Sequence, residues 1–237
     1  MNKICLIRQD AGLGDIFFCQ KIGYHYQKMG YKIIWPVKKV FNYISEYMTN
    51  FSYPCVDDEF PYKDLYLNMN NKEIIETDDM IMIPLNGHNL RSSSVMYSKY
   101  ILVGLPYYDW NKFFNFTRNI EQENRLFYDI LELKDGEEYT LYNTAFASPP
   151  EIQYKDIPTD NITDKLVKME LFEGITLFDW CKVIENATNI LTVDTAINYI
   201  IDKLSINTNN LQLYSRYTPA NYGQIKGIFK TKWKYNI

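Results

Sequence analysis

The sequence predicts an α/β fold in which strands and helices alternate in each half of the chain. In each half, an apolar strand runs through a short turn into a helix: residues 4–7 lead to a turn at 11–15, and residues 189–193 lead to a turn at 194–197. Such alternation is typical of parallel sheets covered by helices. The 237 residues, 46% of them hydrophobic and 23% charged, suffice to bury the core of one large or two small domains.

The first half begins with a strand at residues 3–8, and a helix at 15–29 ends at Gly30, a suitable C-terminal stop. Residues 32–37 predict the second strand. Apolar residues at helical spacing then predict a short helix through Phe41, Ile44, Tyr47 and Met48. Two further apolar runs, at 64–67 and 80–83, predict more strands. The order is that of a parallel sheet with helices on both faces.

The middle of the chain is rich in aromatic residues. Residues 92–118, broken at Gly104 and Pro106, predict a helix, a turn and a second helix that join the halves. A fresh helix is expected at 120–131, before a turn at Asp135 and Gly136. The predicted domains are therefore residues 1–115 and 116–237.

The second half repeats the alternation. A strand at 139–142 precedes a polar loop that extends to about residue 161, and strands are expected at 165–169, 189–193 and 211–214. Thr176 predicts a helix N-cap, with Asp179 as the acidic partner of a capping box. A helix at 196–204 places Ile197, Ile200 and Ile201 on one face.

Composition narrows the classes of function. The net charge of −4 argues against a protein whose main task is to grip nucleic acid. The sequence shows no signal peptide and no apolar stretch that could span a bilayer, so a cytoplasmic protein is expected. Four scattered cysteines form no CxxC pair, and Cys5 and Cys181 fit a reduced core. The two histidines do not pair with cysteines at metal-ligand spacing, so no metal site is expected.

The turn at 11–15 carries Gly12, Gly14 and Asp15. Glycines let a backbone turn tightly and approach an anionic ligand closely. Asp15 is either a helix cap or a general base. Position 17 is Phe, so the third glycine of the dinucleotide fingerprint is missing and a dinucleotide-dependent oxidoreductase is disfavoured.

The turn at 194–197 reads Asp194, Thr195, Ala196 and Ile197. Thr195 and the N–H groups of Ala196 and Ile197 could hold a phosphate at the helix N-terminus. The alternative is that Asp194 or Thr195 merely caps the helix, which is the commoner role for these residue types.

These two turns, with the order of elements around them, resemble the GT-B glycosyltransferases, and most closely the bacterial heptosyltransferase family. The resemblance implies a compact pair of Rossmann-like domains that face a cleft, with the acceptor on the N-terminal domain and the nucleotide sugar on the C-terminal one. It also implies that Asp15 is the general base and that Asp194, Thr195 and Ala196 hold the donor diphosphate. This chain departs from the family in its shorter length, in Ala196 where the family has glycine, and in Asn198-Tyr199 where the family has a small residue and histidine.

Other side chains are weaker candidates, each with a plain structural alternative. Glu173 could accept hydrogen bonds from a ribose, and Asn143 and Ser148 could line the donor pocket. Arg118 and Arg125 could reach a diphosphate or form surface ion pairs. Arg8 and Gln9 could face the cleft, although Arg8 could instead pair with an acid. His88 could touch the acceptor, whereas His25 is expected to be structural. The basic, aromatic tail after residue 222 is expected to cross back to the first domain.

The expected function is transfer of a sugar from a nucleotide-diphosphate donor to a hydroxyl of a glycan or lipid-linked glycan. The donor is a co-substrate, and no other cofactor is expected. The chain lacks a DxD motif, which fits a metal-independent reaction; the acidic pairs at 57–58 and 78–79 are expected to be solvated. The alternatives are a non-catalytic sugar- or nucleotide-binding module of the same fold and a DNA-base glucosyltransferase, which would bind DNA in a salt-sensitive way.

Overall fold

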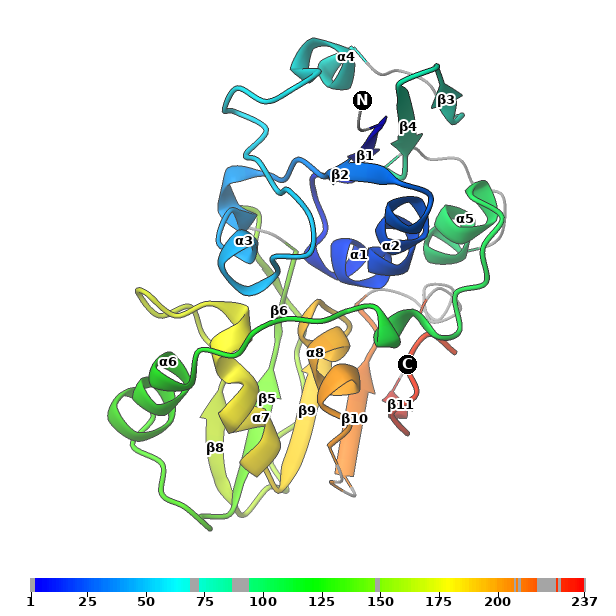
Figure 1. Ribbon diagram of the computed structural model, residues 1–237. Helices are drawn as coiled ribbons and strands as arrows, with labels where there is room; N and C mark the ends of the chain where they lie inside the picture. Colours follow the sequence, from blue (N-terminus) through cyan, green and yellow to red (C-terminus); the bar gives the residue numbers. More distant parts are fainter. Residues whose placement is uncertain are drawn as a thin grey trace. The chain divides into compact units, whose positions relative to one another are not determined.

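The computed structural model describes residues 3–68, 73–86, 94–147, 150–206, 208, 210–216, 225 and 227–236. The chain divides into two compact units, Met1–Phe116 and Thr117–Ile237. Both are α/β units built on mainly parallel sheets, which confirms the predicted fold class (Figure 1). The cleft between two domains stays a prediction.

The first unit contains a four-stranded sheet in the order β2-β1-β4-β3. Its strands are β1 (Lys3–Arg8), β2 (Tyr31–Ile34), β3 (Ile75–Glu76) and β4 (Met80–Pro84). The first three in this order run parallel, and β3 pairs antiparallel with β4 at the edge. Cys5, Leu6 and Ile7 have no exposed surface, as expected of a central parallel strand that is covered on both faces.

The helices of the first unit are mostly short. They are α1 (Leu13–Phe18), α2 (Gln20–Lys28), α3 (Ile44–Tyr47), α4 (Lys63–Leu67) and α5 (Val95–Leu102), with 3₁₀ turns η1 (Lys39–Phe41) and η2 (Trp110–Lys112). Phe17 of α1 stacks on Phe114, with ring centroids 4.4 Å apart. This contact packs the segment after η2, the last part of the first unit, against helix α1.

The predicted helix at 15–29 begins earlier and is interrupted. Helix α1 starts at Leu13, so Gly14 and Asp15 lie in its first turn rather than before it. The interruption falls at Cys19, where the Gln20 side chain donates to the Ile16 carbonyl at 3.0 Å. That side-chain bond satisfies a carbonyl that a continuous helix would pair with a backbone N–H.

Two other predictions for the first unit are wrong. Residues 64–67 lie in helix α4 rather than in a strand, because only Tyr66 of this run is buried, while Leu65 and Leu67 stay 46% and 54% exposed. A short apolar run of this kind does not by itself distinguish a strand from a helix. In the stretch at 94–118, helix α5 forms, but the second helix is reduced to the 3₁₀ turn η2, which follows Pro106.

The second unit contains a parallel five-stranded sheet in the order β11-β10-β9-β5-β8. Its strands are β5 (Tyr139–Asn143), β8 (Lys165–Lys168), β9 (Asn189–Val193), β10 (Asn210–Tyr214) and β11 (Lys234–Asn236). The short strands β6 (Ala145–Phe146) and β7 (Gln153–Tyr154) form a separate hairpin in the loop after β5.

Helices of the second unit gather on one face of its sheet (Figure 1). Helix α6 (Ile120–Asn124) continues into a π-helical turn, η3 (Arg125–Ile130), close to the predicted 120–131. The 3₁₀ turn η4 (Leu177–Trp180) leads into α7 (Cys181–Asn186), and the capping box between Thr176 and Asp179 is present as predicted. Helix α8 (Ile197–Leu204) buries Ile197, Ile200 and Ile201.

The described part of the C-terminal tail belongs to the second unit, so the expected return to the first domain is wrong. Strand β11 pairs with β10 and extends the second sheet. Phe229 packs edge-on against Tyr199 of α8, with ring centroids 5.0 Å apart, and Trp233 is 7% exposed. Burial of these aromatic rings on the second unit explains why the tail stays there.

The order of strands in each sheet reverses at one point. In the first unit, β2 lies on one side of β1 and β4 on the other; in the second unit, β8 lies on one side of β5 and β9 on the other. In open α/β sheets, ligands bind outside the carboxyl ends of the strands at such a reversal. The segments that follow β1 and β4, and those that follow β5 and β9, are therefore the places to examine for function.

The four cysteines are free and buried, in agreement with the reduced core predicted for Cys5 and Cys181. In the described parts of the chain, no helix is long and apolar enough to cross a membrane.

Gly23 of α2 provides a test of the packing in the first unit. A Cβ at this position would lie 2.6 Å from Cζ of Phe51. Replacing a helix-interior glycine with alanine normally stabilises by about 0.5–1 kcal/mol, but here the overlap with a packed ring is expected to destabilise by about 1–3 kcal/mol. Urea denaturation of Gly23→Ala measures the change. In a Phe51→Leu background the same substitution should lose its cost; an equal cost in both backgrounds would rule out the overlap with Phe51.

Candidate functional site

A buried lysine joins the carboxyl ends of two strands in the first unit. Lys99 of α5 has a side chain that is only 4% exposed. Its Nζ donates to the Leu85 carbonyl, just after β4, at 2.7 Å, and to Oε1 of Gln9, just after β1. The same Nζ lies 3.1 Å from Oδ1 of Asp15, whose side chain is 29% exposed. The ammonium thus bridges the point where the strand order reverses.

Gln9 is itself held in place. Its side-chain amide donates to the Ala11 carbonyl, and its backbone carbonyl accepts a hydrogen bond of 3.0 Å from the indole N–H of Trp35, just after β2. Gln9 is 5% exposed. Segments that follow three parallel strands therefore meet around one polar network, which fixes the turn that carries Asp15.

Gly12 has a backbone conformation that favours glycine, and it lies against the Asp15 carboxylate. Its φ is +77°, in the left-handed region that favours glycine, and a Cβ there would lie 2.5 Å from Oδ2 of Asp15. Gly12 is the N-cap of α1, and no side chain caps the helix there. The structure therefore places Asp15 as a partner of Lys99 and gives the helix-cap interpretation no support.

The second turn lies between β9 and α8 in the second unit. Asp194 is 6% exposed, and its backbone N–H donates to the carbonyl of Tyr214, at the end of β10, at 3.0 Å. Its Oδ2 accepts a hydrogen bond of 3.3 Å from Nε of Arg216, which follows β10. Asp194 is thus a link between two strand ends, and it brings a cation to the carboxyl edge of the sheet.

Asn198 of α8 changes the chemistry of this turn. Its Oδ1 accepts a hydrogen bond of 2.7 Å from the backbone N–H of Thr195. Asn198 has no exposed surface, and its Nδ2 has no partner among the described residues. The backbone N–H groups of Ala196 and Ile197 likewise have no acceptor in the described part of the chain. Two N–H groups at the start of α8 are therefore without an acceptor among the described residues.

The other residues predicted from the sequence to contact the donor or the acceptor differ in their burial and contacts. Asn143 is 5% exposed and donates to Oγ1 of Thr192 and to the Ala145 carbonyl, both at 3.3 Å, so it braces β5 against β9 instead of facing solvent. Glu173 is exposed in the loop after β8, at the carboxyl edge of the sheet. Ser148 and His88 lie outside the residues that the structure describes.

Arg118 forms ion pairs, which was the alternative to binding a diphosphate. Its guanidinium donates to both carboxylate oxygens of Glu123, which is 1% exposed, and to both oxygens of Glu185 at 2.8 Å. The hydrogen bonds to Glu123 raise the pKa of Arg118. Arg125 donates to Gln122, and the Arg8 guanidinium lies 5.7 Å from the centre of the Tyr66 ring. These contacts give the three arginines structural roles.

Two functional candidates were missed in the sequence, Lys99 and Arg216. Lys99 gave no signal because its partners are distant in sequence; 90 residues separate it from Gln9. Arg216 could have been found, because it follows the final predicted strand of the second half and so lies at the same sheet edge as Asp194.

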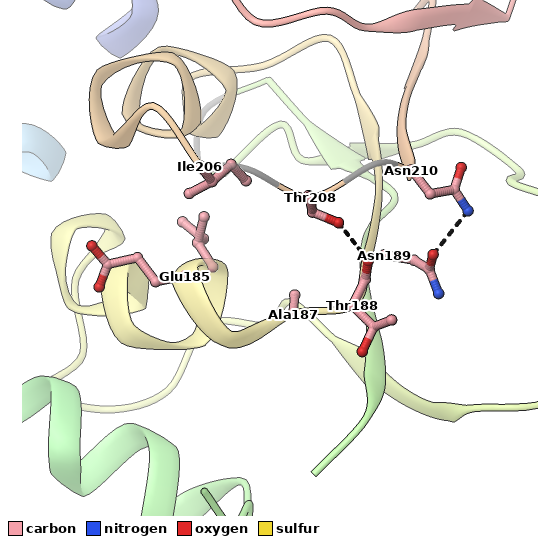
Figure 2. Close-up of a pocket in the computed structure, with 8 residues that line it drawn as sticks. Glu185, Ala187, Thr188, Asn189, Ile206, Thr208 and Asn210 are labelled. Atoms are coloured by element: carbon pink, nitrogen blue, oxygen red, sulfur yellow. Dashed lines mark hydrogen bonds between the residues drawn. The ribbon is translucent and has the colours of Figure 1, made fainter. Parts of the chain in front are cut away.

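A pocket of about 530 Å³ lies elsewhere in the second unit. Figure 2 shows Asn189 and Asn210 on its strand side and Glu185 on the helix α7 side. Asn189 and Asn210 are the first residues of β9 and β10, so the pocket is at the amino edge of the sheet, opposite the turn at Asp194. Glu185 is already paired with Arg118. The pocket is therefore separate from the candidate site.

No cluster of three or more His, Cys, Asp or Glu residues that could hold a metal ion occurs among the residues with a described position.

Comparison with solved structures identifies similar folds. The chain is similar to a glycosyl transferase family 9 protein from Veillonella parvula, with a TM-score of 0.59, 10% identity, and coverage of 99% of this chain and 87% of that one. It also matches the iron-containing dodecameric glycosyltransferase TibC from enterotoxigenic E. coli, with a TM-score of 0.48, 9% identity, and coverage of 92% of this chain and 61% of that one. A third match is the E. coli heptosyltransferase WaaC with ADP, with a TM-score of 0.40, 11% identity, and coverage of 92% of this chain and 88% of that one.

The match to the V. parvula protein confirms, for the fold, the predicted resemblance to glycosyltransferases of this kind. No protein-family model matches the sequence, and no curated protein sequence matches it.

The ion pairs of Arg118 predict a stability role without a binding role. Arg118→Met leaves the buried Glu123 carboxylate without its cation and should lower the free energy of unfolding by about 2 kcal/mol. Affinity for nucleoside diphosphates should not change. Chemical denaturation and calorimetric titration measure the two effects, with Arg125→Met as the control for loss of a neighbouring surface cation. Loss of nucleotide binding at unchanged stability would return Arg118 to the list of ligand-binding residues.

Proposed function

We propose that the protein transfers a sugar from a nucleotide-diphosphate donor to a hydroxyl group of a glycan or lipid-linked glycan. The observation that carries the proposal is a pair of strand–turn–helix sites, one at the strand-order reversal of each unit. One site presents a carboxylate, and the other presents backbone N–H groups beside an arginine. The fold shared with a glycosyl transferase family 9 protein supports the same function.

In this proposal Asp15 is the general base. Lys99 holds Oδ1, and Oδ2 lies over Gly12 with no other partner among the described residues. A carboxylate oxygen within hydrogen-bond reach of an acceptor hydroxyl can take its proton. The acceptor oxygen then forms a bond to the anomeric carbon of the donor. The bond from that carbon to the diphosphate breaks, and the nucleoside diphosphate leaves with the electron pair.

The second turn holds the diphosphate in this proposal. The N–H groups of Ala196 and Ile197 are at the positive end of the α8 dipole, where negative charge is stabilised. Arg216 brings a guanidinium to the same edge of the sheet. Because these groups can stabilise the leaving diphosphate by themselves, the proposal includes a metal-independent reaction. Glu173, at the end of the neighbouring strand β8, is the proposed ribose contact.

Two features favour a second candidate function, a sugar- or nucleotide-binding module without catalysis. Asn198 already occupies the Thr195 N–H, and Ala196 carries a Cβ where a glycine would leave more room for a ligand. Both features reduce the number of contacts that a diphosphate can make here. Binding of a nucleotide sugar without release of its nucleoside diphosphate would support this alternative.

The first experiment identifies the donor and then removes the base. A thermal-shift screen with UDP, GDP, ADP and their sugars finds the nucleotide, because a ligand of the native state raises the melting temperature. With the donor found, Asp15→Asn should slow release of the nucleoside diphosphate by about 10²-fold or more and leave the donor Kd unchanged.

Asp10→Asn is the matched control, since Asp10 lies at the same sheet edge but contacts Asn86 rather than Lys99. It should retain the rate of the natural chain. Equal rates for Asp15→Asn and the natural chain would remove Asp15 from the mechanism.

The role of Arg216 is tested by binding alone. Arg216→Met should weaken the affinity for the nucleoside diphosphate by about tenfold, because a charged hydrogen bond to phosphate is lost. Lys165→Met is the control, since Lys165 is an exposed cation at the amino end of β8, paired with Glu137. Calorimetric titration in which both variants bind like the natural chain would place the diphosphate away from Arg216.

A further inference from the structure

The Lys99 ammonium makes contacts of two kinds. It donates hydrogen bonds to Oε1 of Gln9 and to the Leu85 carbonyl, and it forms an ion pair of 3.1 Å with Oδ1 of Asp15. The two hydrogen-bond acceptors are neutral and buried with it. Asp15, with 29% of its side chain exposed, is the one partner that reaches solvent. The buried ammonium therefore pairs with the residue that is proposed as the base.

Cys19 is the described ionisable group whose pKa responds to both members of this pair. Cys19, at the junction of α1 and α2, is fully buried, and burial raises the pKa of its thiol to about 12, with Lys99 lowering and Asp15 raising that value. The thiol is therefore neutral at physiological pH. The groups from β1 and β4 that face the ammonium, Gln9 and the Leu85 carbonyl, are also neutral. Lys99 and Asp15 balance each other's charge.

The carboxylate of Asp15 is fixed from two sides. Lys99 holds Oδ1, and Oδ2 lies in the space left by the missing side chain of Gly12. Helix α1 and the end of β1 are both tied to the same ammonium, so the carboxylate has a defined direction before any ligand arrives. Pre-organised direction is the property that proton transfer in a transition state requires.

We propose that Lys99 is the positioning residue for the general base: it holds one oxygen of Asp15 so that the other is presented to the acceptor hydroxyl. This inference rests on the proposed function of Asp15. Lys99 touches neither donor nor acceptor in this scheme and acts through Asp15 alone. Its loss should therefore change the rate of the chemical step and leave the binding of substrates unchanged.

The experiment compares two buried lysines of the first unit. Lys99→Met should lower kcat for nucleoside diphosphate release by about 10²-fold, the cost of a misplaced catalytic group, with KM and the donor Kd unchanged. Lys21 is the matched control, because its ammonium donates to the Pro106 carbonyl at 2.6 Å and pairs with Asp109 instead of Asp15. Lys21→Met should lose thermal stability and keep kcat.

Two more variants keep the test valid if Lys99→Met fails to fold. Lys99→Gln retains a donor for the Leu85 carbonyl but has no charge for Asp15, and it should show the same loss of kcat at constant KM. Gly12→Ala should show that loss as well, because the new Cβ would displace Oδ2 from its position. Circular dichroism and thermal melting verify that each variant is folded.

The outcomes separate the two proposals. If Asp15→Asn is inactive while folded Lys99→Gln and Lys99→Met keep the natural kcat, Asp15 is the base and the positioning role of Lys99 is wrong. If Lys99→Gln and Lys21→Met lose kcat equally, Lys99 acts only through stability, and the inference is also overturned. If Asp15→Asn retains full activity, or no nucleotide sugar is cleaved by the natural chain, the proposed function fails first.

Discussion

The first unit depends on one buried positive charge. The Lys99 ammonium connects the segments after β1 and β4 to the first turn of α1, and it does so at the reversal of strand order where an open α/β sheet would otherwise offer a crevice. A buried cation is tolerated only when it is paired and fully hydrogen-bonded. The Gln9 and Leu85 oxygens accept its hydrogen bonds and Asp15 pairs with its charge, so one set of contacts holds the turn and directs the carboxylate.

Both units have a turn between a strand and a helix, but the two turns present groups of opposite polarity. In the first, the reversal point is filled by Lys99, and the turn presents an acidic oxygen. In the second, the N–H groups of Ala196 and Ile197 in the turn before α8 have no acceptors in the described part of the chain, and Arg216, which follows β10, lies beside Asp194. A carboxylate suits removal of a proton, and N–H groups with a guanidinium suit a leaving diphosphate. These are the two roles that the proposed transfer of a sugar from a nucleotide donor assigns to the two turns.

The sequence predicted features that depend on neighbours along the chain and missed those that depend on distant partners. The central strands β1 and β9, the capping box of Thr176 and Asp179, and the apolar face of α8 all follow from local periodicity or spacing. The apolar run at 64–67 predicts a strand but forms a helix, because a short run alone does not show which side chains become buried. Three features arise only from tertiary packing. They are the hydrogen bond from Lys99 to Gln9, the break in the helix at Cys19 and the burial of Trp233 on the second unit.

The position of the diphosphate is the central claim, and backbone amide NMR during titration with the nucleoside diphosphate identified by thermal shift tests it most directly. The N–H signals of Ala196 and Ile197 are expected to shift with saturation, accompanied by the side-chain signal of Arg216. Signals of Asn189 and Asn210, which line the pocket at the opposite edge of the sheet, should stay unchanged. Shifts confined to those two residues, with none at Ala196 and Ile197, would contradict the assignment of the donor site.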